Sequence, residues 1–159
     1  MRTTLLASLL VIVVVLGVVL YKTNGDRLLG HPLPYDARAP FGGVSLNIEF
    51  ATTTAARELG LGGRTSIPGD YGMLFVFPDD GYHGFWMKDM VLPIDIFWLD
   101  AQGQVVSIAP NVAPSTYPNV FYPAVPARYV LETAAGFSAV HHIVNGTPLE
   151  LKNFPIVSQ

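Results

Sequence analysis

The sequence of 159 residues contains no cysteine. It therefore cannot form a disulfide, use a thiolate nucleophile, or bind zinc or an iron–sulfur cluster through cysteine. A lipid-modified N-terminal cysteine is excluded for the same reason. Secreted domains of this size can fold without disulfides when their core is adequate, so the absence is compatible with either side of a membrane.

Charged residues are also scarce, at 13% of the chain against about 25% in an ordinary globular protein. Residues 40–159 carry five basic and ten acidic side chains, a net charge of −5, without a cluster of lysine or arginine. Such a domain repels phosphate backbones, so we expect no nucleic-acid partner. Because half of the residues are hydrophobic, the chain is too apolar to be disordered.

No charge interrupts residues 5–21, which we interpret as an N-terminal transmembrane anchor or signal segment. As a helix, these 17 residues would span about 25 Å, slightly less than the ~30 Å hydrocarbon core of a bilayer. A cleaved signal has a shorter apolar region and a small-x-small site, so the pattern favours an uncleaved anchor and leaves cleavage as the alternative. Both interpretations predict a membrane partner through residues 5–21 and a globular domain on the extracytoplasmic side.

Residues 22–43 contain three prolines and four glycines, which disfavour a regular element. We interpret this segment as a Pro/Gly-rich tether. The remaining residues, 44–159, are then expected to form a single globular, β-rich domain.

Short apolar or alternating runs separated by turn residues predict several strands. Residues 44–51 alternate apolar and polar side chains, which is typical of a half-buried strand. Similar patterns predict further strands near 73–77, 85–88, 94–99, 104–109, 129–133 and 149–151, and short helices near 52–59 and 134–142. The expected fold is mainly β with short helices (α+β), as a compact barrel-like or sandwich-like, mostly antiparallel sheet.

Residues 110–126 are rich in proline and predict a long loop. Loops of this length are usually functional or disordered, and the aromatic residues argue against disorder. Tyr117, Phe121 and Tyr122 of this loop could line a groove together with Trp86 and Tyr129. For Trp86 and Tyr129, a place in the hydrophobic core is the alternative. Flat aromatic faces with a few polar groups are suited to a sugar or a peptide.

Two runs of residues carry a resemblance to a known family. They are Gly72-Met73-Leu74-Phe75-Val76-Phe77 and Phe85-Trp86-Met87-Lys88-Asp89-Met90-Val91-Leu92-Pro93-Ile94-Asp95-Ile96, supported by Pro126-Ala127-Arg128-Tyr129-Val130-Leu131-Glu132. Through them, the chain resembles the domain-of-unknown-function 192 family of small, often exported or anchored proteins over residues 44–151. The family has no agreed activity, so the resemblance implies a fold and a set of positions.

The chain departs from the family pattern at two of these positions. The family commonly has Gly-Leu-Met-x-Arg after the first helix, and here Gly62 replaces the methionine while Arg64 is retained. The family commonly has Asn-Thr after the lysine, and here Asp89 and Met90 follow Lys88. We include Arg64 and Asp89 among the candidate ligand-binding residues.

Asp95 lies among apolar residues of a predicted strand, where a carboxylate must be paired or have a raised pKa. Lys88 is the nearest candidate partner along the chain. The pair could simply stabilise the pairing of two strands. Alternatively, Lys88 and Asp95 could face a ligand beside Trp86.

Arg128 and Glu132 lie at the two ends of another apolar strand. Glu132 and Asp95 could together supply the two carboxylates of a glycoside hydrolase. The complete set of candidate ligand-binding residues is Arg64, Trp86, Lys88, Asp89, Asp95, Tyr122, Arg128 and Glu132.

The sequence favours a membrane-tethered binding or accessory domain for a glycan, peptide or protein ligand. The alternatives are a structural or assembly role, in which Lys88 and Asp95 only stabilise the fold, and a glycan hydrolase that uses Asp95 and Glu132. The turn with Asp79, Asp80 and His83 matches neither a calcium nor a zinc pattern, so we expect no metal and no other cofactor.

Overall fold

The computed structural model describes residues 35–155. The expected anchor at residues 5–21 and the tether up to residue 34 lie outside the described residues. Among the residues that are described, no helix has both the length and the apolar character needed to cross a membrane.

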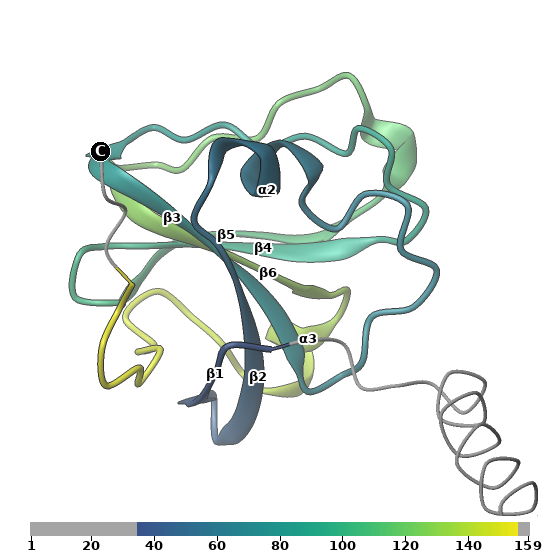
Figure 1. Ribbon diagram of the computed structural model, residues 1–159. Helices are drawn as coiled ribbons and strands as arrows, with labels where there is room; N and C mark the ends of the chain where they lie inside the picture. Colours follow the sequence, from purple (N-terminus) through teal and green to yellow (C-terminus); the bar gives the residue numbers. More distant parts are fainter. Residues whose placement is uncertain (1–34, 156–159) are drawn as a thin grey trace, which may run out of the picture. The chain divides into compact units, whose positions relative to one another are not determined.

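A single six-stranded sheet forms the centre of the domain (Figure 1). Its strands follow the order β1-β2-β3-β6-β4-β5, and only the β2–β3 pair is parallel. The elements are β1 (Ala37–Phe41), β2 (Val44–Ala51), α2 (Thr54–Leu59), β3 (Tyr71–Gly81), β4 (Ile94–Leu99), β5 (Val105–Val112), the 3-10 turn η1 (Pro114–Thr116), β6 (Ala127–Ala134) and α3 (Phe137–Val140). The predicted mainly β, mostly antiparallel fold is confirmed. Because the sheet is not closed, the fold is sandwich-like and not a barrel.

The two faces of the sheet are covered differently. Side chains alternate between the two faces along a strand, and residues paired across neighbouring strands point to the same face. Leu131 is paired with Leu74 of β3 and with Phe97 of β4, so these three residues share one face, which we call the core face. These three residues belong to the main hydrophobic cluster, which also includes Phe137 of α3 and Leu149 of the C-terminal segment. The opposite face carries α2, and we call it the pocket face. Figure 1 shows α2 and α3 on opposite sides of the sheet.

Residues 37–41 form a strand, so the prediction of an irregular tether over 22–43 is wrong for this part. β1 pairs with β2 in register, with Phe41 opposite Val44. Gly42 and Gly43 both have positive φ angles, 60° and 83°, and form the turn of this hairpin. Phe41 is fully buried and stacks on Phe137 at a centroid distance of 5.8 Å. Of the residues that suggested a tether, Pro40, Gly42 and Gly43 are therefore the edge and turn residues of a hairpin.

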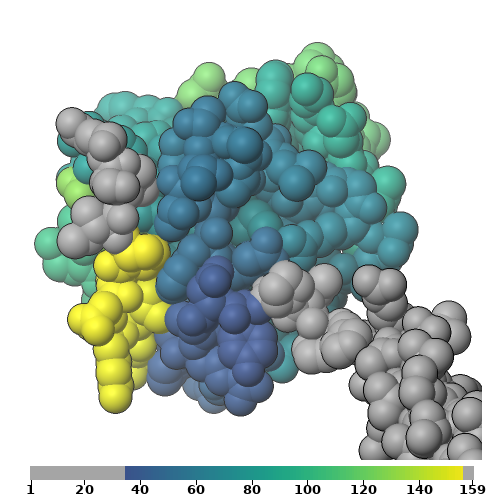
Figure 2. Space-filling view, in the orientation of Figure 1, coloured from purple at the N-terminus to yellow at the C-terminus, as the bar shows by residue number. Residues whose placement is uncertain are grey.

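The C-terminal segment completes the core face beside this hairpin. Leu149 forms an isolated bridge with Phe41, and the Glu150 N–H donates to the Pro40 carbonyl at 3.0 Å. Figure 2 shows this segment, in yellow, next to the dark blue hairpin. The strand predicted at 149–151 is thus reduced to a single bridge.

Predicted boundaries hold for β2 and β4 and shift elsewhere. Residues 85–88 were predicted as a strand, but only Phe85 forms a bridge, with Phe121. Phe85 and Met87 are buried while Trp86 and Lys88 are exposed, so the segment alternates like a strand although only Phe85 is paired. Residues 78–81 extend β3, and residues 110–112 of the predicted long loop extend β5.

Candidate functional site

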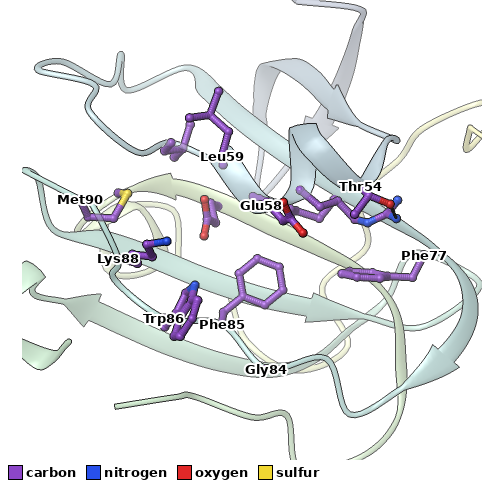
Figure 3. Close-up of a pocket in the computed structure, with 14 residues that line it drawn as sticks. Thr54, Glu58, Leu59, Phe77, Gly84, Phe85, Trp86, Lys88 and Met90 are labelled. Atoms are coloured by element: carbon purple, nitrogen blue, oxygen red, sulfur yellow. Dashed lines mark hydrogen bonds between the residues drawn. The ribbon is translucent and has the colours of Figure 1, made fainter. Parts of the chain in front are cut away.

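A pocket of about 590 Å³ lies on the pocket face, between α2 and residues 84–90. Its lining residues are Thr54, Arg57, Glu58, Leu59, Gly60, Leu61, Phe75, Phe77, Gly84, Phe85, Trp86, Lys88, Met90 and Glu132. In Figure 3, Glu58 of α2 and Lys88 of the opposite segment lie on facing walls, with the Phe85 ring between them. Volumes of this size are typical of sites for small organic ligands.

Helix α2 forms one wall and is attached to the sheet through Arg57. The helix begins after Thr53, whose side chain accepts a hydrogen bond from the Ala56 N–H at 3.1 Å. Arg57 donates to the carbonyls of Thr52, at 2.8 Å, and Val76 of β3, at 3.0 Å. Its guanidinium also lies 5.4 Å from the centroid of the Phe77 ring. These contacts hold α2 above the sheet.

Gly60 ends α2 directly above the floor of the pocket. Its φ of 51° lies in the left-handed region, where glycine is favoured. A Cβ atom at this position would lie 3.2 Å from the Phe75 ring and 3.8 Å from Oε2 of Glu132. The backbone of α2 therefore packs closely over the Glu132 carboxyl group.

Glu132 is the polar group at the floor of the pocket. It lies on β6, is 4% exposed, and its Oε2 has no hydrogen-bond partner among the described residues. Burial raises the pKa of Glu132 from its usual 4.5 to about 8, against a smaller opposing effect of Arg64. At neutral pH the carboxyl group is therefore predominantly protonated and can donate a hydrogen bond.

Arg64 belongs to a polar cluster next to the pocket. It donates to the Tyr71 hydroxyl at 2.7 Å and pairs with Glu49 at 2.8 Å, and the Tyr71 hydroxyl also donates to Glu49. Burial, followed by the hydrogen bond to Glu49, raises the pKa of Tyr71 well above its usual range. Arg64 does not line the pocket, but its positive charge opposes the rise in the pKa of Glu132.

Trp86 and Lys88 form the wall opposite α2. Trp86 is 49% exposed, and the Lys88 ammonium lies 6.0 Å from its ring centroid. The Tyr117 ring is also near Trp86, with its centroid 5.8 Å from that of the Trp86 ring. Trp86 thus contacts Tyr117 of the predicted loop, while Tyr117 itself does not line the pocket.

Asp95 does not pair with Lys88, so that prediction is wrong. Its Oδ1 accepts from the backbone N–H groups of Asn111 and Gly136, at 2.8 and 3.0 Å. Its Oδ2 accepts from the Ser138 N–H and hydroxyl, at 2.7 and 2.6 Å. Asn111 and Gly136 have positive φ angles of 51° and 85°, so Asp95 holds two left-handed turns against β4. Its role is to stabilise the fold.

Asp95 and Glu132 also cannot act as a catalytic pair. In the β4–β6 ladder Asp95 lies opposite Thr133, and Ile96 lies opposite Glu132. Successive residues face opposite sides of a sheet, so the two carboxylates point to different faces. A glycosidase requires both carboxyl groups beside one bond of the substrate. The paired-carboxylate hydrolase is therefore contradicted by the geometry.

The other candidate residues lie outside the pocket. Asp89 has a positive φ of 58° and accepts from the Gly63 N–H through its carbonyl, which connects two loops. Arg128 forms an ion pair with Asp80 at 2.6 Å. Tyr122 is 62% exposed and packs on Gly84 at the rim. Of the eight candidates, the pocket therefore includes Trp86, Lys88 and Glu132.

Sequence reasoning missed the wall made by α2 and the aromatic floor. The apolar surroundings of Phe75 and Phe85 in the sequence indicate core residues. Both are buried, and both also line the pocket. The sequence signal for the α2 wall was Gly60, because a glycine directly after a predicted helix often adopts the left-handed conformation that ends the helix.

Three comparisons place the chain among known proteins. A family model described as "Uncharacterized ACR", the domain of unknown function 192, matches residues 37–151. No curated protein matches the chain. The chain is similar to a solved structure of a protein proposed to be a transcription regulator from Sinorhizobium meliloti 1021, with 28% identity and a TM-score of 0.67 over 75% of this chain and 97% of that chain. It is also similar to a protein of unknown function from Novosphingobium aromaticivorans DSM 12444, with 29% identity and a TM-score of 0.66 over 72% and 82%.

The first prediction concerns the pH dependence of stability caused by Glu132. The folded pKa of about 8 exceeds the usual 4.5, so unfolding releases a proton between these pH values. The stabilising contribution is complete below pH 4.5 and is lost as pH rises to about 8, at roughly 1.4 kcal/mol per pH unit. Glu132→Gln lacks this contribution. Urea unfolding of both proteins from pH 4.5 to 9 should show the difference in free energy changing with this slope, and parallel profiles would refute it.

The second prediction concerns Asp95. Asp95→Asn retains the size of the side chain but leaves one accepting oxygen for four donors. We expect the free energy of unfolding to fall by about 3–5 kcal/mol, because buried N–H groups lose their partners. The control Ser138→Ala removes only the hydroxyl donor and should cost about 1 kcal/mol. Equal and small effects in urea unfolding would show that Asp95 does not organise these turns.

Proposed function

The chain belongs to the domain-of-unknown-function 192 family, and we propose that it is a binding domain whose ligand site is the pocket between α2 and residues 84–90. The observation that carries the proposal is Glu132, a buried carboxyl group with an unpartnered oxygen at the floor of an aromatic pocket. A buried polar atom without a partner costs free energy, so its retention there requires a reason. A ligand that supplies the missing hydrogen bond provides this reason.

The surroundings of Glu132 support binding of a small organic molecule. Phe75 and Phe85 are buried beside it, with ring centroids 4.8 Å apart in an edge-to-face contact, so the two rings pack against each other at the floor. Trp86 is half exposed and offers its indole ring at the entrance. Apolar walls with a few convergent polar groups are typical of ligand sites.

A role in binding DNA is less well supported by this chain. The structurally similar Sinorhizobium protein is proposed to be a transcription regulator, but residues 40–159 here carry a net charge of −5. Two of the basic side chains, Arg64 and Arg128, are already paired with carboxylates. DNA affinity depends on basic groups that are available to phosphates.

We place the binding domain on the extracytoplasmic side of a membrane, as an accessory domain attached through residues 5–21. The support for this location is the sequence, in which those 17 residues carry no charge. Attachment to a membrane would keep the pocket near ligands that are present at the cell surface.

The third prediction tests this attachment. Arginine in place of both Val13 and Leu16, at the middle of the run, should release the full chain from membranes. Each charge at this depth costs about 2.5–3.5 kcal/mol of insertion free energy. Thr23→Arg, placed beyond the run, is the control and should stay in the membrane fraction after alkaline extraction. A native chain that is soluble and shortened by about 20 residues would indicate a cleaved signal instead.

The fourth prediction tests binding at the pocket. A panel of aromatic fragments, glycan fragments and short peptides should contain a compound that raises the melting temperature of the protein. A ligand present at about 100 times its Kd adds roughly 2.7 kcal/mol to stability. Trp86→Ala should abolish the shift while leaving the melting temperature of the free protein nearly unchanged, since Trp86 is exposed. Tyr82→Ala, which is 59% exposed and outside the pocket, is the matched control. Equal shifts in both variants would place binding elsewhere.

A further inference from the structure

We propose that the ligand of this pocket is a small carboxylate with an apolar body. Its carboxylate would lie between Glu132 and Lys88, and its body would lie against the rings of Phe85 and Trp86. The inference rests on the proposed function and specifies the chemistry of the ligand. It follows from three features of the pocket, which are the unpaired cations, the unpartnered carboxyl group and the aromatic walls.

The cations that line the pocket are not neutralised by carboxylates. Within residues 35–155, the ion pairs are Arg64–Glu49 and Arg128–Asp80, so neither Arg57 nor Lys88 takes part in one. Arg57 is hydrogen-bonded to two backbone carbonyls and the Thr54 hydroxyl, which leaves its charge uncompensated. Lys88 is exposed, and only its contact with the Trp86 ring is seen. The Lys88 ammonium is therefore available to an anion, and the Arg57 guanidinium adds its positive charge to the pocket.

Of the two acidic residues that line the pocket, Glu58 and Glu132, only Glu58 contributes a full negative charge at neutral pH. Burial raises the pKa of Glu132 to about 8, which leaves this group neutral at pH 7. The charged groups that line the pocket are then Arg57 and Glu58 from α2 and Lys88 from the facing segment, with a net charge of +1. Outside the lining, Arg64 is balanced by Glu49. β3 and β4 contribute only uncharged side chains around Glu132, such as Phe75 and Ile96.

A neutral carboxyl group and a lysine together form a receptor for a carboxylate. The protonated Glu132 can donate a hydrogen bond to one oxygen of the ligand, and this bond is strengthened because its acceptor is charged. Lys88 supplies the counter-charge and further donors. A cationic ligand would instead face Arg57 and Lys88, and it would have to deprotonate Glu132 before it could form an ion pair.

The aromatic side chains determine what the remainder of the ligand can be. Phe75, Phe77, Phe85 and Trp86 contribute flat apolar surfaces, and the volume of about 590 Å³ accommodates a ring with a short side chain. An acyl or arylalkyl carboxylate fits this description better than a highly hydroxylated sugar acid, because few polar partners are present deep in the pocket.

The fifth prediction compares three probes that share one body and differ in the head group: 3-phenylpropanoate, 3-phenylpropanamide and 3-phenylpropylammonium. Kd values for the full chain in detergent micelles are measured by NMR titration at pH 6.5, 8.0 and 9.0, since ligands of this size bind in the millimolar range. We expect the carboxylate to bind at least about tenfold more tightly than the other two at pH 6.5. Its affinity should fall about fivefold between pH 8.0 and 9.0, because a growing fraction of Glu132 must take up a proton before the carboxylate can bind.

Two variants separate a role in binding from a role in folding. Glu132→Gln keeps a donor at the same place without a titrating proton, so the carboxylate should still bind and its pH dependence should disappear. Lys88→Met should weaken the carboxylate about tenfold and leave the amide unchanged. Lys152→Met is the matched control, because Lys152 is exposed and outside the pocket, and it should change neither.

Other results would overturn the inference in distinguishable ways. Tighter binding of the ammonium probe, increasing with pH, would show that the pocket selects cations, and the proposed function would stand. Equal affinities of the three probes would show that the head group is not recognised. Failure of all three probes, together with a positive hit of another class in the thermal panel that Trp86→Ala abolishes, would reject only the carboxylate. Failure of both experiments would reject the proposed function as well.

Discussion

The register of β6 between β3 and β4 is the constraint on which the structure depends. Leu131 points into the core face and Glu132 points into the pocket face, and each has a fixed partner on both neighbouring strands. A slip of one residue would exchange the two side chains, placing a carboxyl group among Phe97 and Phe137. One strand alignment therefore produces both the apolar core and the polar floor of the pocket. Burial of Leu131 in the core stabilises this alignment and thereby keeps Glu132 on the pocket face.

Two buried carboxyl groups near the centre of this sheet have opposite surroundings. Asp95 receives hydrogen bonds from three backbone N–H groups and a hydroxyl. Glu132 lies on the neighbouring strand and leaves an oxygen without a partner. The hydrogen bonds of Asp95 are complete among the described residues, whereas the same part of the chain supplies no partner for Oε2 of Glu132. This contrast separates a residue that stabilises the fold from the one that we propose to serve a ligand, although both are acidic and buried.

Local patterns in the sequence were sufficient for much of the fold. Val44–Ala51 and Ile94–Leu99 were predicted with their observed boundaries, because alternation and apolar runs reflect burial directly. β1 was missed because Pro40, Gly42 and Gly43 occur in tethers as well as in hairpins, and only the packing of Phe41 on Phe137 distinguishes them. The partner of Asp95 was also misassigned. Periodicity indicates the face of a strand on which a residue lies, but the donors at Gly136 and Ser138 come from a turn about 40 residues away.

The site was partly predictable for the same reason. In the sequence, Lys88 stands out as a lone cation beside the aromatic Trp86, and Glu132 stands out as an acid in an apolar run. The opposite wall depends on how Arg57 attaches α2 to the Val76 carbonyl, a contact between distant parts of the chain that no local pattern encodes.

The hairpin of β1 and β2 also has a mechanical consequence. Ala37, the first residue of the edge strand β1, lies opposite Ile48, and the turn at Gly42 and Gly43 lies at the other end of the strand. A pull on Ala37 away from the sheet would break the ladder one pair at a time, as in unzipping, instead of shearing all pairs together. Tension from an N-terminal attachment would therefore peel β1 first and reach Phe41 last. The edge of the sheet could yield under load while the strands that form the pocket remain paired.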